Sequence, residues 1–438
     1  MMRVFRLLLP LSLICRYNPA GAYPSLPQFL ALRGNTQDPT DPSWIENYAA
    51  IGDSYAAGIG AGDVLSGNGD VACSRYDGAY PVLLNNSFGA QSKFQFLACS
   101  GDESTHVKDQ INKLDDNSQD LITVSAGGND VLLSDVLKAC IYTPAGQDEC
   151  NKAIARTRDA IDKTLQSSVD DLLQALASKV KKGGIVVYTL YAQFFNADTD
   201  ACNSQSWDWF QGIIPGDYGL KLSKELRKNL NDLVVTANTK IRGAIAGQSG
   251  STRPSSLNIA IADWDAIVGE NHGRFCEDGS ADDPNDPSNA GLVFQRFNAA
   301  PIYIPPGKNK DAVQQLNKRI DDSMARVFHP TILGQQVIAT HALLALLDAK
   351  GKLYGGEPPK SCSIPVQNPP SCAASSNQGI SKDRFTEARD TWCKDNTKPI
   401  DPSKDYSKYF SMEFKKADGT CPPNDCVDTL NKAWNACE

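Results

Sequence analysis

The chain has 438 residues, more than one hydrophobic core usually supports, because most domains contain between about 50 and 250 residues. Its hydrophobic content of 41% and charged content of 21% are ordinary for a globular protein, which excludes a largely disordered chain, a collagen-like repeat and a multi-span membrane protein. The formal net charge of −8 repels a phosphate backbone, so we expect no nucleic-acid partner.

The first 22 residues have the organisation of a secretory signal peptide. Arg3 and Arg6 precede the apolar run Leu7–Ile14, and Ala20-Gly21-Ala22 supplies small residues for cleavage. The apolar run is shorter than the roughly 20 residues that span a bilayer, and no later segment was expected to be long and apolar enough. We therefore predict a secreted, extracellular monomer with no stable membrane anchor, in which residues 23–44 form an N-terminal extension.

Cysteine usage agrees with export from the cell. Of the 13 cysteines, Cys15 lies in the predicted signal peptide, which leaves an even number in the mature chain. Disulfides are the default interpretation of such cysteines in a secreted protein. The disulfide candidates of the first part of the chain are Cys73, Cys99, Cys140, Cys150, Cys202 and Cys276.

Short apolar runs bounded by Gly, Asp or Ser alternate with longer stretches of helical periodicity. The strands predicted in chain order are Tyr48–Ile51, Phe94–Ala98, Leu121–Val124, Ile185–Tyr188 and Leu257–Ile261. The predicted helices are Ile154–Val180, ending at Gly183-Gly184, then Leu222–Ala246 and Leu333–Leu347. This alternation predicts an α/β fold of three layers, α/β/α, with a central parallel sheet of about five strands.

Two segments interrupt the alternation. Gly269–Pro306 is rich in Gly, Asp, Asn and Pro, which predicts a long loop that forms one wall of a pocket. A Pro/Gly-rich stretch near residues 350–360 marks a boundary between a domain at 45–350 and a linker with a small cysteine-rich C-terminal module at 351–438. Aromatic residues in this module are expected to form its small core, with sugar stacking as the alternative.

The first predicted strand runs into Gly52-Asp53-Ser54-Tyr55. Ser54 thus follows the carboxyl end of a parallel strand, where open α/β sheets bind ligands, and is a candidate nucleophile. The same residues are equally compatible with a simple helix N-cap. The glycines at 58, 60 and 62 lack the dinucleotide spacing G-x-G-x-x-G, and the chain has no G-x-S-x-G pentapeptide typical of α/β-hydrolases.

Three further segments extend this pattern along the chain. Cys99-Ser100-Gly101 follows the second predicted strand, Gly128-Asn129-Asp130 follows the third, and His329-Pro330 precedes the last predicted helix. Together with the Ser54 segment they resemble the SGNH (GDSL) hydrolases, whose four blocks supply a Ser, a Gly, an Asn and a His in this order. The resemblance covers roughly residues 45–348 and implies the flavodoxin-like SGNH-hydrolase fold.

The resemblance also implies a role for each block residue. Ser54 would be the nucleophile and His329 the general base, while the backbone N–H groups of Ser54 and Gly101 and the amide of Asn129 would form an oxyanion hole. A turn residue is the alternative interpretation of Asn129. His106, His272 and His341 match no block and are expected to be structural.

The chain departs from the commoner family pattern at the triad acid, which usually lies three residues before the histidine. Arg326 occupies that position, so the chain resembles secreted members with a Ser-His dyad, in which a main-chain carbonyl orients the imidazole. Four carboxylates are possible substitutes, and each is expected to be solvated or to cap a helix: Asp263, Asp265, Asp321 and Asp322.

The cysteines fit the same arrangement. Cys73 and Cys99 flank the Ser54 segment and lie beside Gly101, Cys140 and Cys150 would close a short loop, and Cys202 would reach Cys276, although sequence cannot establish these pairings. A Cys73–Cys99 bond would pin the loop after Ser54 against the Gly101 loop.

These observations predict a secreted carboxylic ester hydrolase that acts through an acyl-serine intermediate, with no metal or organic cofactor. The expected partner is an ester substrate, either lipid-like or a small acyl ester, with a cell-wall polymer also in range. The alternatives are a polysaccharide deacetylase or other carbohydrate esterase of the same fold, and a catalytically silent secreted binding protein.

Overall fold

The computed structural model describes residues 42–88, 92–143, 146–207, 219–247, 252, 254, 256–279, 291–296 and 325–354. The predicted signal peptide, most of the N-terminal extension, and the C-terminal module lie outside the described residues, as do Asp321 and Asp322. The chain separates into two compact units with a division between Ile364 and Pro365, and every described residue belongs to the first unit.

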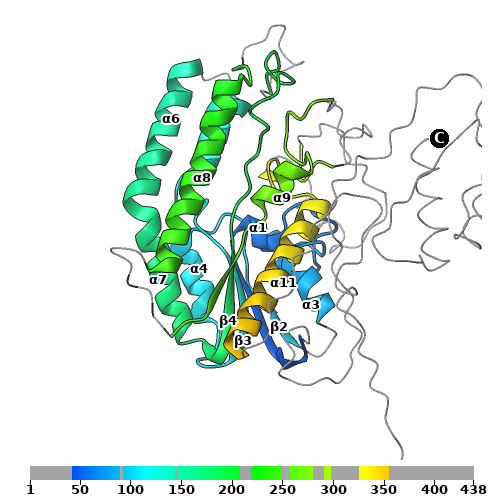
Figure 1. The fold of residues 1–438 in the computed structure, drawn as a ribbon, viewed down its shortest axis with the longest axis vertical. Helices are drawn as coiled ribbons and strands as arrows, with labels where there is room; N and C mark the ends of the chain where they lie inside the picture. Colours follow the sequence, from blue (N-terminus) through cyan, green and yellow to red (C-terminus); the bar gives the residue numbers. More distant parts are fainter. Residues whose placement is uncertain are drawn as a thin grey trace, which may run out of the picture. The chain divides into compact units, whose positions relative to one another are not determined.

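A five-stranded parallel sheet forms the centre of the described fold (Figure 1). Its strand order is β2-β1-β3-β4-β5, so the first strand lies between the second and the third. The strands are β1 (Asn47–Gly52), β2 (Lys93–Phe96), β3 (Gln119–Ser125), β4 (Val180–Thr189) and β5 (Ile259–Ala262). Each contains or overlaps one of the five predicted strands, which confirms the α/β prediction.

The sheet explains why these runs were continuously apolar. All seven residues of β3 are buried, as are the last five of β1, because helices cover both faces of a parallel sheet. Figure 1 shows α4, α6, α7 and α8 on one side of the sheet and α3 and α11 on the other. The carboxyl ends of the parallel strands therefore meet along a single edge, and the loops that leave this edge carry the candidate site.

The described helices are mostly short near the site and long on the flanks. In chain order they are η2 (Pro42–Trp44), α1 (Ser54–Ala57), α2 (Asn68–Ala72), α3 (Tyr80–Ser87), α4 (Ser104–Asn112), α5 (Leu133–Leu137), η3 (Lys138–Tyr142), α6 (Gly146–Ala160), η4 (Ile161–Leu165), α7 (Gln166–Ala177), α8 (Lys224–Ala246), α9 (Asp265–Glu270) and α11 (Ile332–Tyr354). Because η4 is a π-helical turn between α6 and α7, the three run as one helix with a π-bulge.

The predicted end of this long helix was wrong. The helix stops at Ala177, and Gly183-Gly184 lies inside β4 instead of closing a helix. Val180 pairs with Gln119 and Ile185 pairs with Leu121, so β4 bulges outward between the two pairs. Gly183 has φ +83°, and a Cβ on Gly184 would stand 2.9 Å from the Gln119 carbonyl oxygen. The two glycines thus permit a bulge and a close backbone approach.

The last described helix, α11, is rich in apolar residues. Within the described residues, Ile332–Leu353 is the segment long and apolar enough to cross a membrane by length and composition, which corrects the expectation that no later segment would be. In the fold, however, α11 packs on β4, β5 and α3, and side chains such as Val337, Ile338 and Leu346 are buried. These apolar residues of α11 therefore belong to the core of the described fold.

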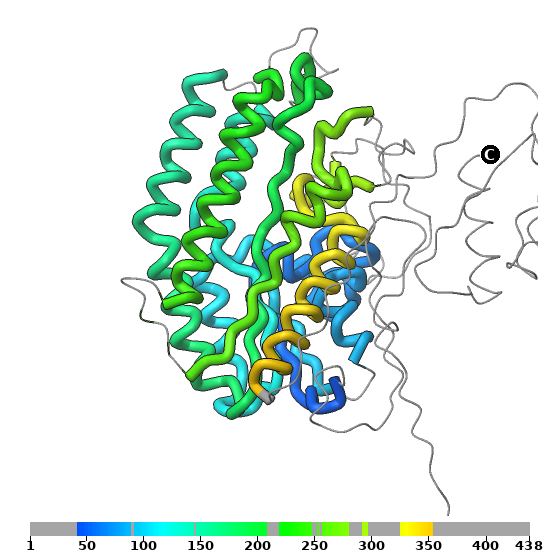
Figure 2. Tube along the Cα trace, in the orientation of Figure 1, coloured from blue at the N-terminus to red at the C-terminus, as the bar shows by residue number. Residues whose placement is uncertain are grey.

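The Cα trace shows how far apart in sequence the packed elements are (Figure 2). The yellow α11, near the end of the described chain, lies beside the blue α3 near its start. A direct bond secures this approach, because the Tyr80 backbone N–H donates to Gln335 Oε1 at 2.9 Å. The segment just before α11 is thereby brought to the region that follows β1.

Candidate active site

The turn after β1 presents Ser54 as the first residue of the short helix α1. Asp53 is the N-cap, since its Oδ1 accepts from the Tyr55 backbone N–H at 3.0 Å, so the helix-cap interpretation describes Asp53 and leaves the Ser54 hydroxyl uncommitted. Gly52 has φ +131°, and a Cβ there would stand 2.1 Å from the Ser125 carbonyl oxygen. Only glycine allows β1 to turn this close to β3.

The Ser54 hydroxyl meets the imidazole of His329. Ser54 Oγ lies 2.6 Å from His329 Nε2, although 275 positions separate the two residues in the chain. Ser54 is 9% exposed and His329 is half-buried, so the pair lies at the surface of the fold and is shielded on its inner side. A base at this distance is placed to accept the hydroxyl proton.

The other nitrogen of the ring faces a backbone carbonyl. His329 Nδ1 lies 3.3 Å from the Val327 oxygen, so the Nδ1–H tautomer donates to the main chain and leaves Nε2 free to accept from Ser54. Asp263 pairs with Arg242, and Asp265 bonds Arg274 at 2.8 Å, which engages both carboxylates away from the imidazole. Neither Asp263 nor Asp265 therefore orients His329.

Burial lowers the pKa of His329 to about 4, because surrounding protein disfavours the charged imidazolium. Hydrogen bonds with the backbone of Val327, Arg326 and Ala325 act in the opposite direction and only partly offset this effect. The ring is therefore neutral at physiological pH, which is the protonation state that a general base requires.

The loop that carries His329 is held in a conformation that its sequence disfavours. Phe328 has φ +66°, which is unfavourable for a bulky residue, yet its side chain is buried. Its ring packs edge-on against Phe194, Phe195 and Phe275, with centroid separations of 5.0, 5.5 and 5.1 Å. The aromatic cluster of Tyr142, Phe194, Phe195, Trp207, Phe275, Phe294 and Phe328 thus anchors the loop.

Two further contacts fix the loop from the side of Ser54. The Tyr55 hydroxyl donates to the Phe328 carbonyl at 2.9 Å. Gln295 pairs with the loop through its backbone, donating to His329 O at 2.8 Å and accepting from Phe328 N at 3.0 Å. The Gln295 side-chain amide also donates to Ile59 O at 2.7 Å and Pro330 O at 3.0 Å. Gln295 therefore joins the histidine loop to the chain that follows Ser54.

The oxyanion candidates follow the neighbouring strands. No acceptor in the described part of the chain takes the backbone N–H of Ser54 or Gly101, so these donors face no described competitor. The Asn129 amide donates to Asp102 O at 2.9 Å, which orients the group and leaves its second N–H available. Gly101 has φ +89°, and a Cβ on it would meet nothing within 4 Å, so backbone conformation, not lack of space, explains this glycine.

A buried carboxylate, that of Asp53, lies directly behind the turn that carries Ser54, called here the nucleophile turn (Gly52–Ser54). Asp53 is 2% exposed and accepts from Ser125 Oγ at 3.0 Å and from the Tyr191 hydroxyl at 2.6 Å. Burial raises the pKa of Asp53 to about 6, although the bonds from Tyr191, Tyr55 and Ser125 lower it in part. This network connects β1, β3 and the segment after β4 beneath Ser54.

Three disulfides are present among the described residues, joining Cys73 to Cys99, Cys140 to Cys150 and Cys202 to Cys276. The first lies beside the site: the backbone N–H of Cys99 donates to Gly52 O at 2.9 Å, and that of Ser100 donates to Cys73 O at 3.0 Å. The Gly101 loop is thus tied both to the end of β1 and to the segment after α1. Such a cross-link reduces the freedom of both loops.

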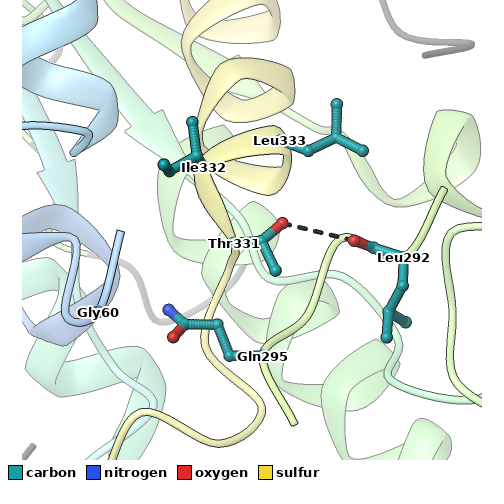
Figure 3. A pocket seen from close by; sticks show the side chains of 6 residues that line it. All are labelled: Gly60, Leu292, Gln295, Thr331, Ile332 and Leu333. Atoms are coloured by element: carbon teal, nitrogen blue, oxygen red, sulfur yellow. Dashed lines mark hydrogen bonds between the residues drawn. The ribbon is translucent and has the colours of Figure 1, made fainter. Parts of the chain in front are cut away.

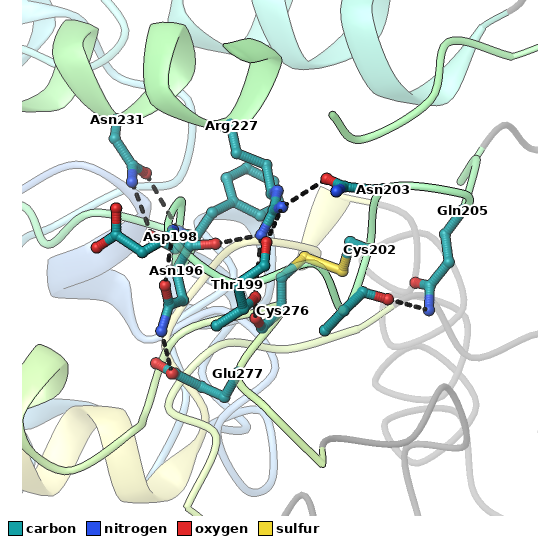
Figure 4. Close-up of a disulfide and its surroundings, with 12 residues drawn as sticks. Asn196, Asp198, Thr199, Cys202, Asn203, Gln205, Arg227, Asn231, Cys276 and Glu277 are labelled. Atoms are coloured by element: carbon teal, nitrogen blue, oxygen red, sulfur yellow. Dashed lines mark hydrogen bonds between the residues drawn. A yellow bond between two sulfur atoms is a disulfide. The ribbon is translucent and has the colours of Figure 1, made fainter. Parts of the chain in front are cut away.

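The Cys202–Cys276 bond lies next to a buried arginine (Figure 4). Arg227 of α8 is fully buried and donates to Thr199 O at 2.6 Å, to Asn203 Oδ1 at 2.9 Å and to Asn196 O. Burial lowers the pKa of this guanidinium. Its acceptors all lie in the loop that supplies Phe194 and Phe195, so Arg227 and the disulfide together support the aromatic cluster under Phe328.

An open cavity of about 390 Å³ adjoins the histidine loop (Figure 3). Leu292, Ile332 and Leu333 supply apolar side chains to its lining, and Gly60, Gln295 and Thr331 complete it. Thr331 Oγ1 donates to the Leu292 carbonyl at 3.4 Å, which links the two sides. Ile332 is 47% exposed, so the cavity offers apolar surface close to the segment that carries His329.

Tyr191 and Gln295 are site residues that the sequence did not single out. Tyr191 follows β4 at the same sheet edge as the other blocks, so the rule that located Ser54 would also have located it. Gln295 lies in the predicted long loop, which has no periodicity to mark it. Among the described residues, no group of three or more His, Cys, Asp or Glu side chains is arranged to hold a metal ion.

Comparison with known proteins identifies the matching segment. Residues 50–243 match the GDSL-like Lipase/Acylhydrolase family. Lipase 1 of Streptomyces coelicolor is 32% identical over 165 residues, which cover 37% of this chain and 59% of that protein. A lipase of Streptomyces rimosus is 32% identical over 149 residues, covering 34% of this chain and 53% of that protein. This chain thus spans somewhat more than half the length of these curated relatives.

A solved structure gives a further comparison. The crystal structure of an extracellular lipase from Streptomyces rimosus covers 66% of this chain and 94% of its own, with 23% identity and a TM-score of 0.44. The matched family segment contains Ser54, Gly101 and Asn129, and His329 lies beyond it. Residues 50–243 and the order of these blocks are thus similar to those of the GDSL-like, or SGNH, hydrolases.

Proposed function

We propose that the protein is a secreted carboxylic ester hydrolase in which Ser54 forms an acyl-enzyme intermediate. The observation that carries this proposal is the 2.6 Å separation of Ser54 Oγ and His329 Nε2. A serine hydroxyl is a weak nucleophile until a neighbouring base takes its proton, and this pair supplies both groups. The similarity of residues 50–243 to a lipase and acylhydrolase family supports ester substrates.

In the first half of the proposed reaction, His329 Nε2 takes the Ser54 proton as Oγ attacks the ester carbonyl. The negative oxygen that develops is stabilised by the N–H groups of Ser54 and Gly101 and by the Asn129 amide. The Val327 carbonyl accepts from Nδ1–H and so stabilises the imidazolium that forms. His329 then protonates the leaving alcohol.

In the second half, water enters and His329 accepts its proton. The resulting hydroxide attacks the acyl-Ser54 carbonyl, and the same donors hold the second tetrahedral oxygen. Collapse releases the carboxylic acid as His329 returns the proton to Ser54 Oγ. The burial that holds the pKa of His329 near 4 keeps the base neutral at the start of each half.

We further propose an acyl group that is lipid-like or small. The apolar lining formed by Leu292, Ile332 and Leu333, next to the segment of His329, supports this substrate class. The names of the two Streptomyces relatives, both lipases, agree with it. We also propose that the protein is a secreted monomer; the signal-like residues 1–22 and the three disulfides support the secretion.

A direct assay tests the assignment. p-Nitrophenyl esters from acetate to long acyl chains are offered to the wild type and to Ser54→Ala, and both proteins are treated with a fluorophosphonate probe. We expect wild-type turnover and labelling, with both lost in Ser54→Ala. Equal activity in the two proteins contradicts the hydrolase assignment, and a preference for acetate over longer chains contradicts a lipid-like substrate.

A further inference from the structure

One phenol bridges two of the loops that carry the oxyanion candidates. The Tyr191 hydroxyl donates to Asp53 Oδ2 at 2.6 Å and accepts from the Gly128 backbone N–H at 3.0 Å. Asp53 immediately precedes Ser54, and Gly128 immediately precedes Asn129. The Tyr191 hydroxyl thus bonds the residue just before Ser54 and the residue just before Asn129. In the proposed mechanism, the Ser54 N–H and the Asn129 amide must face the same substrate oxygen.

The other connection between these loops ends at the strands. Asp53 N donates to Ser125 O at 2.8 Å, and Ser125 Oγ donates to Asp53 Oδ1, which continues the pairing of β1 with β3. Ser125 is the last residue of β3, and the chain then runs three residues further to Gly128. Gly127 in between has φ +112°, so the loop turns after leaving the sheet. The bond from Gly128 to Tyr191 fixes the loop beyond that turn.

The packing around Gly128 matches the hydrogen bond. A Cβ on Gly128 would stand 3.3 Å from both Cζ and the hydroxyl oxygen of Tyr191, which is tighter than an ordinary side-chain contact. The backbone of the Asn129 loop therefore rests directly on the end of the phenol. A glycine at this position allows the close approach without displacing the phenol.

Tyr191 is itself rigidly held. Asn238 of α8 accepts from the Tyr191 backbone N–H at 3.1 Å and donates to its carbonyl at 2.7 Å. The ring meets that of Tyr55 edge-on, with centroids 5.1 Å apart, and Tyr191 is 3% exposed. Because its backbone, ring and hydroxyl are all fixed, Tyr191 can hold the two loops at a constant separation.

From this geometry we propose that Tyr191 is a positioning residue, which holds the nucleophile turn and the Asn129 loop in register so that their donors converge on one oxyanion. The inference rests on the proposed esterase function. Tyr191 is separated from the substrate by Asp53 and Gly128, so its effect is on the placement of Ser54 and Asn129. Small displacements of donors or reacting groups cost catalysis far more than they cost ground-state binding.

The variant Tyr191→Phe removes the hydroxyl and keeps the ring. We expect kcat for p-nitrophenyl acetate to fall about 10- to 100-fold while KM stays within about twofold, because the oxyanion donors are misplaced and not deleted. Hydrogen–deuterium exchange should show reduced protection of the Gly128 amide, since its acceptor is gone.

Tyr48→Phe is a matched control. The Tyr48 hydroxyl is also fully buried and bonds Thr123 Oγ1 at 3.0 Å, but Tyr48 lies at the start of β1, away from the site edge. The control makes the same chemical change at a similar burial. We expect its stability to fall about as much as that of Tyr191→Phe, while its kcat stays within about twofold of the wild type.

Two results would overturn the inference. The first is a kcat in Tyr191→Phe that falls no further than in Tyr48→Phe. If Tyr191→Phe does not fold, Gly128→Ala gives the second test, because its methyl group presses on the phenol and leaves every polar group in place; an unchanged kcat there also overturns it. A wild type inactive on all esters would instead contradict the proposed function.

Discussion

Two regions of the site are held in place in different ways. One is the sheet edge that carries Ser54, Gly101 and Asn129, and the other is the loop that carries His329. At the edge, parallel strands set the positions, and short loops are fixed by hydrogen bonds, by Cys73–Cys99 and by Tyr191. The histidine loop belongs to no strand of the sheet, although two backbone hydrogen bonds pair it with Gln295. It is fixed by Phe328 in the aromatic cluster and by Gln295, both remote from β1 in sequence.

Strand pairing in the sheet thus places Ser54, the proposed nucleophile, whereas side-chain packing together with backbone bonds to Gln295 places His329, the proposed base. A strand-edge residue is aligned by many backbone bonds, so single side-chain changes there should act locally. The histidine loop includes a left-handed Phe328, whose strain persists only because its surroundings over-determine it. Substitutions in the residues that pack around Phe328 should therefore displace His329, although they leave the histidine itself unchanged.

The largest effect is expected from His329, the proposed base. His329→Ala removes the proton acceptor 2.6 Å from Ser54 Oγ, and kcat should fall by about 10⁴-fold or more. Steady-state hydrolysis of a p-nitrophenyl ester measures it. Activity within tenfold of the wild type would show that the loop of His329 is not the source of the base.

The sheet edge should give the next largest loss. Asn129→Ala removes a side-chain donor, and kcat should fall about 10²- to 10³-fold with little change in KM. The same assay, with thermal unfolding as a check on folding, measures the split. A rise in KM at constant kcat would instead indicate that Asn129 binds the ground state.

A smaller loss should follow from loosening the histidine loop. Gln295→Ala deletes the amide that bonds Ile59 O and Pro330 O, and we expect kcat to fall about tenfold as His329 drifts. Gln193→Ala is the control, because the Gln193 amide bonds Asp265 at 2.7 Å, away from the loop. Equal losses in both variants would contradict a specific role of Gln295.

The pH dependence tests the environment of the base. The pKa of His329 is about 4 in the folded protein, below the usual 6.5, so the ring stays neutral well into acid. The acid limb of kcat/KM should therefore lie below pH 6.5. The unfolded chain takes up the His329 proton at higher pH than the folded chain, so the contribution of His329 to stability falls as pH drops from 6.5 towards 4, while that of Asp53, whose pKa is raised to about 6, changes in the opposite direction. An acid limb at or above pH 6.5 would contradict this burial.

The smallest effect on turnover is expected from the opposite end of β4. In Gly184→Ala the new Cβ would press on the backbone oxygens of Gln119 and Asp120 at 2.9 and 3.0 Å. The free energy of unfolding should drop by about 1–3 kcal/mol, measured by urea titration, while kcat stays unchanged. A large loss of kcat in the folded variant would show that the bulge and the site edge are coupled.

The sequence predicted the parts of the fold that rest on local pattern. Continuous apolar runs located all five strands, and residues after three strand ends located Ser54, Gly101 and Asn129. Gly183-Gly184 misled because a glycine pair after a helical pattern is compatible with a helix end and with a bulge. Pairing with β3 decides between a helix end and a bulge, and the register of that pairing depends on residues far away in the sequence.

Other site features have no signature in one sequence. The acceptor facing His329 Nδ1 is the Val327 carbonyl, a group that every residue possesses, so only the loop conformation selects it. The bonds of Gln295 and Tyr191 depend on which distant loops lie beside them. Their residue types are common, and their importance arises only once the sheet and α11 bring the segments together.

His329 lies three residues before α11, the helix that completes one face of the sheet. A chain still emerging from its ribosome or export channel therefore holds Ser54 long before any proton acceptor can reach it. The proposed hydrolytic activity should appear in the same cooperative step that docks α11, the last described helix. If truncation or mild denaturant undocks α11, the proposed activity should be lost in a single cooperative transition.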